Sequence, residues 1–156
     1  MKIRNFLLLL ALIIAAAGAY KYLSTGSGNR EILRDGYYSA ESASYDHGWK
    51  EFITIYVNNG KIVNVEYNAK NASGFIKSWD MEYMRVMNRA VGNYPNRYTR
   101  SYASALLSGQ GSTEIDAVSG ATDSYSSFKA LAGAVVTQAR AGDKRVAYVE
   151  GTHSDD

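Results

Sequence analysis

The sequence predicts an α+β domain, in which a small, antiparallel-dominated β-sheet packs against about three helices in the order β-β-β-α-α-α-β. Three observations lead to this fold class. Residues 37–67 are rich in β-branched and aromatic residues and contain a hairpin signal. Residues 80–141 carry helical periodicity, and a short strand-like segment follows them. Separate blocks of strands and helices are typical of the α+β class.

The first three strands are predicted as a meander. Residues 49–57 (WKEFITIYV) form its clearest strand, and residues 62–67 (IVNVEY) return from it. Asn58-Asn59-Gly60 lies between them, and Asn and Gly tolerate the positive φ of a tight hairpin. Residues 37–44 are expected to pair with the other side of residues 49–57.

The first predicted helix covers residues 80–91. Met84, Met87 and Val91 lie on one stripe of it, and Gly92 follows as a stop signal. Pro95 is expected in the next loop, and residues 98–107 form a second short helix.

The third predicted helix covers residues 123–141, and residues 128, 131, 132, 135 and 139 share its apolar face. Gly142 is a natural terminator because glycine readily adopts a left-handed conformation. Residues 145–150 (RVAYVE) are the predicted final strand.

The N-terminus has the layout of an export signal. Lys2 and Arg4 precede an uncharged apolar run over residues 6–19, and Ala17-Gly18-Ala19 fits a small-residue cleavage site. An uncleaved anchor is the alternative. That apolar run spans only about 21 Å as a helix, short of a ~30 Å hydrocarbon core, but it could extend to residue 23 if Lys21 snorkels. Both alternatives place the rest of the chain outside the cytoplasm, secreted or anchored on the outer face of the cell membrane.

The predicted organisation is therefore a signal peptide or N-terminal membrane anchor (1–23), a linker (24–34), one domain (35–150) and a disordered tail (151–156). Lys2, Arg4 and Lys21 are three of the 17 basic residues, so the exported part holds 14 against 15 acidic residues. That balance gives no reason to expect a nucleic-acid partner. Cysteine is absent and only two histidines are present, so no disulfide, thiolate nucleophile or histidine-rich metal site is expected.

Residues 116–127 (DAVSGATDSYSS) open the third predicted helix. Ser119 or Thr122 could simply cap it, because hydroxyls satisfy free N–H groups at helix starts. A second interpretation uses the same physics: a helix N-terminus favours phosphate, and Gly120 and Ala121 let a ligand approach the backbone. A threonine hydroxyl at this point could contact a phosphate or be esterified to one.

The run from Asp116 to Thr122 (DAVSGAT) resembles the acceptor motif of bacterial FMN-binding domains. These include the flavin subunits of membrane redox complexes and the flavoproteins of Gram-positive extracellular electron transfer. The resemblance implies that a transferase esterifies FMN to Thr122. It also implies that Asp116 fixes the loop or is read by the transferase, and that the remaining cofactor-binding residues of the motif region are Ser119, Gly120, Ala121 and Ser124.

Weaker similarities to the same family extend from about Asp35 to Gly142, in the expected order. They comprise Asp35-Gly36-Tyr37-Tyr38, Asp46-His47-Gly48-Trp49, Asn59-Gly60-Lys61-Ile62 and the closing helix over residues 126–139. Many extracellular relatives are lipoproteins, whereas this sequence has no cysteine to accept a lipid. Any anchoring would therefore fall to the leader.

Candidates to contact the flavin ring are the flat or polarizable side chains of Trp49, Trp79, Met81 and Met84. Core packing is the alternative explanation for each of them. His47 is a candidate to tune the ring's potential, and the alternative is an ordinary surface-loop histidine.

The resemblance implies an extracytoplasmic electron carrier with FMN as its cofactor. Its partners would be a flavin transferase, a membrane redox donor and, through the leader, the membrane. No catalytic residue and no substrate pocket is evident in the sequence, so we expect an electron-transfer module rather than an enzyme. The alternative function is a surface ligand-binding or structural domain, with FMN bound non-covalently or absent.

Overall fold

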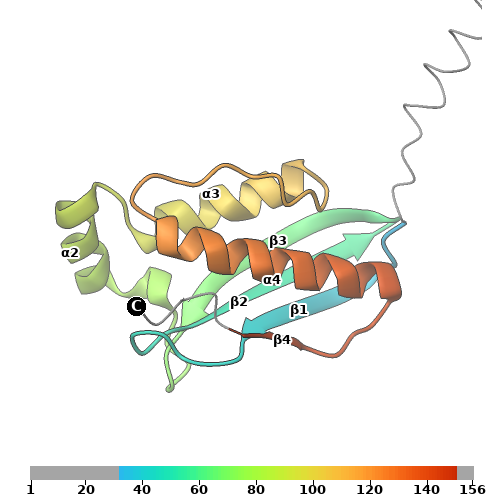
Figure 1. Ribbon diagram of the computed structural model, residues 1–156, viewed down its shortest axis with the longest axis horizontal. Coiled ribbons are helices and arrows are strands. Elements are labelled where there is room, and N and C mark those ends of the chain that lie inside the picture. The colour runs from blue at the N-terminus through green and yellow to red at the C-terminus, as the bar shows by residue number, and fades with distance from the viewer. Residues whose placement is uncertain (1–31, 151–156) are drawn as a thin grey trace, which may run out of the picture. The chain divides into compact units, whose positions relative to one another are not determined.

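The computed structural model describes residues 32–150, so the predicted leader and tail lie outside the described residues. Figure 1 shows one sheet with helices across a single face. The strands are β1 (Gly36–Ser42), β2 (Lys50–Asn58), β3 (Lys61–Lys70) and β4 (Ala147–Val149); the helices are the 3-10 helix η1 (Lys77–Trp79), α2 (Met81–Val91), α3 (Pro95–Ser108) and α4 (Thr122–Ala141). The predicted fold class and element order are confirmed, with the short η1 as an unpredicted addition.

The sheet has the strand order β3-β2-β1-β4. β1, β2 and β3 form the predicted antiparallel meander. Asn59 and Gly60 connect β2 to β3, and both have positive φ (52° and 68°), as a two-residue turn that matches strand twist requires. β4 pairs with β1 in parallel, which is possible because α4 carries the chain back across the sheet.

The core lies between the sheet and the two longer helices, α3 and α4 (Figure 1). Residues 53, 55 and 57 of β2 are fully buried, since alternate residues of a strand face the same side. The apolar face predicted for the last helix is confirmed, because Phe128, Leu131, Ala132, Val135 and Ala139 are all buried.

Two boundary predictions are wrong. The packed domain begins before residue 35, because Leu33 is only 7% exposed and belongs to the core. The backbone N–H of Arg34 donates to the carbonyl of Ala139 at 2.9 Å, so the end of the predicted linker is structured. Pro95 is the first residue of α3 rather than a loop residue, a position where its missing N–H costs no helical hydrogen bond.

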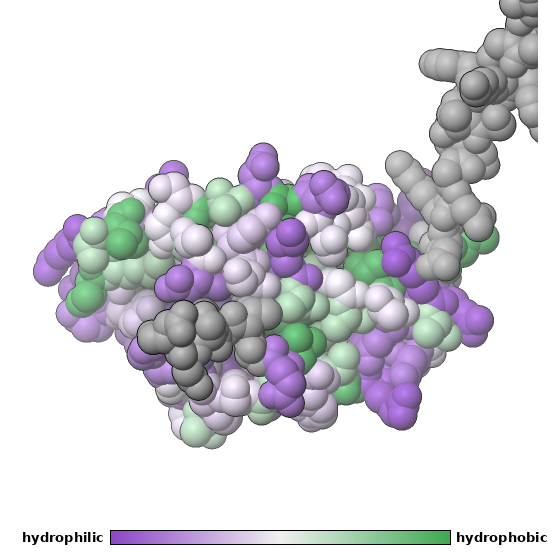
Figure 2. Space-filling view, in the orientation of Figure 1, coloured by the Kyte–Doolittle hydropathy of each residue, from purple (hydrophilic) through white to green (hydrophobic). Residues whose placement is uncertain are grey.

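Helix α2 differs from the other two because none of its residues is fully buried. It lies at one end of the domain (Figure 1), and Met81, Val86 and Val91 are each at least half exposed. Figure 2 shows apolar and charged surface side by side at that end. Within residues 32–150, no helix combines the length and apolar character needed to cross a membrane.

Candidate functional site

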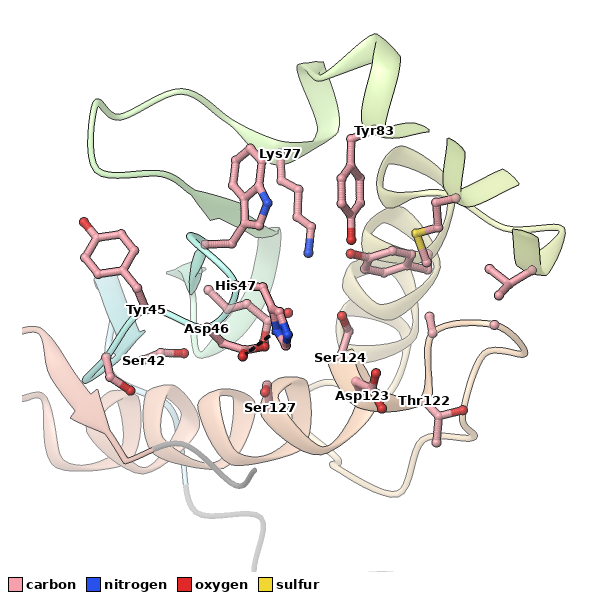
Figure 3. A pocket seen from close by; sticks show the side chains of 18 of the residues that line it. Ser42, Tyr45, Asp46, His47, Lys77, Tyr83, Thr122, Asp123, Ser124 and Ser127 are labelled. Carbon is pink, nitrogen blue, oxygen red and sulfur yellow. Dashed lines mark ion pairs between the residues drawn. The ribbon is translucent and has the colours of Figure 1, made fainter. Parts of the chain in front are cut away.

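A cavity of about 630 Å³ lies where the loop before β2, α2 and the start of α4 meet. Its volume is in the range of small-molecule sites. Residues that line it and that the sequence predicted for cofactor binding are His47, Trp49, Gly120, Ala121, Thr122 and Ser124. Segments far apart in the chain therefore converge here, and Figure 3 shows side chains from them around one space.

The loop before α4 is held in a conformation that requires glycine at position 120. Gly120 has φ +74°, and a Cβ there would lie 2.9 Å from the Val91 carbonyl oxygen. The Asn93 side-chain amide donates to the Ser119 carbonyl at 2.7 Å. Both positive φ and close backbone contact thus exclude a side chain at this turn.

Tyr102 of α3 anchors the same loop from beneath. Its buried hydroxyl donates to the Ala121 carbonyl at 3.2 Å and accepts from the Val118 N–H at 3.0 Å. The backbone on either side of Gly120 is therefore attached to α3. This places the first turn of α4 at the edge of the cavity.

Neither hydroxyl of the motif caps α4. The N-cap residue is Ala121, and the helix start has no side-chain cap hydrogen bond. Thr122 is the first helical residue, and its exposed side chain makes no hydrogen bond to any residue in 32–150. The capping explanation for Ser119 and Thr122 is therefore wrong, and the first-turn N–H groups remain without side-chain acceptors.

Asp116 is exposed and forms no hydrogen bond with the loop or with the rest of the described chain. Asn93 and Tyr102 hold the loop instead. Of the two roles expected for Asp116, fixing the loop therefore has no support in the contacts. Asp116 and Ser119 both lie outside the cavity lining.

The opposite wall of the cavity is aromatic. His47 and Gly48 have positive φ (46° and 82°), and paired backbone hydrogen bonds of 2.8 Å join Asp46 to Trp49. This tight turn positions the Trp49 ring 6.2 Å from the Tyr83 ring, edge to face. The His47 imidazole lies 2.8 Å from Asp46 and is almost fully exposed.

Helix α2 supplies an apolar strip to the same wall. Tyr83, Met87 and Val91 line the cavity, since residues four apart lie on one helix face. The predicted stripe contained two of these three but had Met84 in place of Tyr83. Met84 does not line the cavity, and Trp79 is 64% exposed and contacts the Phe75 ring instead. Met81, 63% exposed, also lies outside the lining.

Glu51 and Lys77 are among the charged residues of the cavity that the sequence analysis missed. The Lys77 ammonium lies 4.9 Å from the Tyr83 ring centre and 5.7 Å from that of Trp49, within the range of cation–π attraction. Glu51 lies at the start of β2 and accepts a 2.9 Å hydrogen bond from the Tyr67 hydroxyl. Burial raises the pKa of Glu51 above its ordinary value, although hydrogen bonds and the Lys77 charge oppose the shift.

The position of Glu51 had a signal in the sequence. Residues 53, 55 and 57 form the buried side of β2, so residue 51 continues the core-facing register. A glutamate at such a position is unusual, because an unpaired buried carboxylate is costly. Lys77 had no comparable signal, since its place depends on how η1 packs.

Carboxylates outnumber cations around the cavity. Asp46, Glu51, Asp123 and Glu150 line it, against the single lysine, Lys77. Within residues 32–150 no group of three or more carboxylate or imidazole side chains is arranged to hold a metal ion. In Figure 3 the labelled side chains of the loop before β2, η1, α2 and the first turns of α4 lie around one space, with Thr122 at its margin.

Comparison with known proteins places the chain in a family. It is 36% identical over 120 residues to the 15 kDa lipoprotein of Treponema pallidum, a match that covers 76% of this chain and 85% of the relative. The chain belongs to the family of this lipoprotein. No protein-family profile matches the sequence.

A solved structure supports the fold of this chain. The crystal structure of the CPE2226 protein from Clostridium perfringens superposes with a TM-score of 0.73 and is 36% identical. The match covers 76% of this chain and 98% of that protein. The described domain therefore corresponds to essentially the whole of that structure.

Proposed function

We propose that this protein carries FMN, joined by a phosphoester to Thr122, and that it transfers electrons at the cell envelope. The observation that carries the proposal is the Thr122 hydroxyl: it is exposed, makes no hydrogen bond within the described residues and stands at the edge of a cavity of about 630 Å³. The DAVSGAT motif supplies the expectation that this hydroxyl is a flavin acceptor.

The surroundings of Thr122 fit a phosphate. The N–H groups in the first turn of α4 have no side-chain cap, and a helix N-terminus favours negative charge. Gly120 carries no side chain at the turn that precedes these N–H groups. In the attachment step, the Thr122 oxygen would displace the leaving group of an activated flavin phosphate, and the hydroxyl proton would be lost.

The cavity fits the ring of the same cofactor. Trp49 and Tyr83 offer flat faces or edges, and Met87 is a polarizable neighbour. FMN would supply the redox chemistry, while the protein's residues would orient the ring and set its electrostatic surroundings. Covalent attachment keeps the flavin at high effective concentration where a dissociated molecule would be diluted away.

Export is supported by the family relationship. The relative from Treponema pallidum is named as a lipoprotein, which fits an exported protein held at a membrane. This sequence has no cysteine, so we assign attachment, or release after cleavage, to the apolar segment within residues 1–23.

The test uses the full chain, produced in cells that export it and express a flavin transferase. After denaturation, wild-type protein should stay yellow and show one FMN-sized mass increment, whereas Thr122→Ala should lose both. The matched control is Ser126→Ala, which removes an exposed hydroxyl one turn further along α4 and should retain the flavin.

Thr122→Ala should remain folded, because its side chain makes no cap hydrogen bond. Circular dichroism of the variant checks this. A wild-type chain of unmodified mass would refute covalent attachment. Flavin that copurifies with native protein but is released on denaturation would favour the alternative of non-covalent binding.

A further inference from the structure

Glu51 is the least exposed of the four carboxylate residues that line the cavity. It continues the core-facing register of β2, and its Oε1 lies 2.9 Å from the Tyr67 hydroxyl. The same hydroxyl lies 3.1 Å from the Ser124 carbonyl oxygen, in the first turn of α4. Glu51, Tyr67 and the backbone of α4 thus form a short hydrogen-bonded chain.

The hydrogen bonds between Glu51, Tyr67 and the Ser124 carbonyl accommodate both protonation states of Glu51 while the heavy atoms stay in place. When Glu51 is ionised, the Tyr67 hydroxyl donates to it. When Glu51 is protonated, it can donate to the Tyr67 oxygen, and Tyr67 can then donate to the Ser124 carbonyl. A proton can therefore be gained or lost here while every group keeps a partner.

Several other groups influence Glu51. Those that interact with it through charge or hydrogen bonds are Tyr67 from β3, Lys77 from η1, Tyr98 and Tyr102 from α3, and Ser124 and Ser127 from α4. The remaining charged or titratable residues on the cavity lining are Tyr45, Asp46, His47, Tyr83, Asp123 and Glu150. Lys77 is the one lysine or arginine on this lining, so the cavity has little positive charge to balance an added electron.

We propose that Glu51 takes up a proton from solvent when a flavin ring in this cavity is reduced. This inference rests on the proposed function. A ring that gains two electrons from an external reductant and one proton from water carries one additional negative charge. As Glu51 changes from carboxylate to carboxylic acid, its own negative charge disappears, so the net charge of the cavity stays constant.

The physical cause is repulsion between like charges. A negative ring raises the cost of a nearby carboxylate, and the effect is larger where water is partly excluded. Reduction therefore raises the pKa of Glu51 further above its ordinary value. At pH values between the pKa of Glu51 in the oxidised protein and its pKa in the reduced protein, one extra proton is taken up with each pair of electrons.

The test measures the midpoint potential of the flavin-loaded full chain against pH, with dithionite as reductant. Each proton taken up with two electrons adds about 30 mV per pH unit to the slope. In wild-type protein, the plot of midpoint potential against pH should contain a range in which the slope is steeper by this amount. Glu51→Gln should lack this steeper range. Glu150→Gln, which removes an exposed carboxylate of the same cavity, should keep the steeper range.

Reduced-minus-oxidised infrared spectra give an independent readout on the unmutated protein. Reduction should produce the carbonyl band of a carboxylic acid, which shifts in heavy water and persists in Glu150→Gln. No such band, or equal slopes in flavin-loaded wild type and Glu51→Gln, would overturn this inference alone. A wild-type chain without flavin would overturn it together with the proposed function.

Discussion

At the scale of single residues, the geometry of the candidate site depends on a few positions with no freedom to vary. Gly120 combines a positive φ with a close contact to the Val91 carbonyl. Tyr102 forms hydrogen bonds with two backbone groups of the loop before α4 from within the core. Neither residue needs to touch a ligand to determine where Thr122 lies.

Gly120→Ala should lower the free energy of unfolding by about 1–3 kcal/mol, because the new methyl group must displace backbone in a conformation that already disfavours alanine. Urea denaturation measures the change. The matched control is Gly74→Ala, because Gly74 has φ +84° but open space where a Cβ would lie. Equal losses in the two variants would show that the contact with Val91 costs nothing.

Tyr102→Phe should cost about 1–3 kcal/mol, since it leaves the Val118 N–H without its partner and removes one of the two hydrogen bonds that the Ala121 carbonyl accepts. Tyr38→Phe is the control. The Tyr38 hydroxyl is buried and has no hydrogen-bond partner among the described residues, so its removal should be neutral or stabilising. A Tyr102→Phe variant as stable as wild type would contradict the anchoring role.

At the scale of elements, the helices differ in what holds them. α4 has a buried face and no side-chain cap, whereas α2 has no buried residue and a cap from Asp80. The Asp80 carboxylate accepts from the Tyr83 N–H at 2.9 Å. Local interactions therefore matter more to α2, which forms a wall of the cavity.

Asp80→Ala should accelerate amide hydrogen exchange in α2 while changing global unfolding little. Loss of such a cap costs about 1 kcal/mol, and a helix without buried residues can open on its own. Hydrogen exchange with mass analysis resolves α2 from α3 and α4. Thr122→Ala serves as the control and should leave exchange in α4 unchanged; equal protection of α2 in wild type and Asp80→Ala would refute the prediction.

At the scale of the whole molecule, one partly buried carboxylate, Glu51, links stability to pH. Because the pKa of Glu51 is raised in the folded state, folding favours its protonated form. The stabilisation is fully present at pH values below the pKa of Glu51 in the unfolded chain. It is lost as the pH rises through the pKa of Glu51 in the folded protein. The pH range in which this stabilisation is lost therefore begins near the ordinary glutamate pKa of 4.5 and extends to higher pH.

We therefore expect the free energy of unfolding of Glu51→Gln to increase relative to that of wild type as the pH rises through that range. Both proteins are measured as flavin-free full chains. Glutamine keeps an acceptor for Tyr67 but cannot ionise. Chemical denaturation at several pH values provides the curve. Glu150→Gln should parallel wild type, and a constant difference for Glu51→Gln would show that the carboxylate stays solvated.

The sequence alone determined the fold class, the meander and the apolar face of α4, because these follow from periodicities in consecutive residues. It also singled out Thr122 and the loop before it. Tertiary structure alone decided the parallel place of β4, the packing of Leu33 and the cavity itself. That cavity joins Glu150 with residues from 42–51, 77–98 and 120–127, and local patterns do not encode which distant segments meet. For the same reason Lys77 had no signal, while Glu51 had one only through its register in β2.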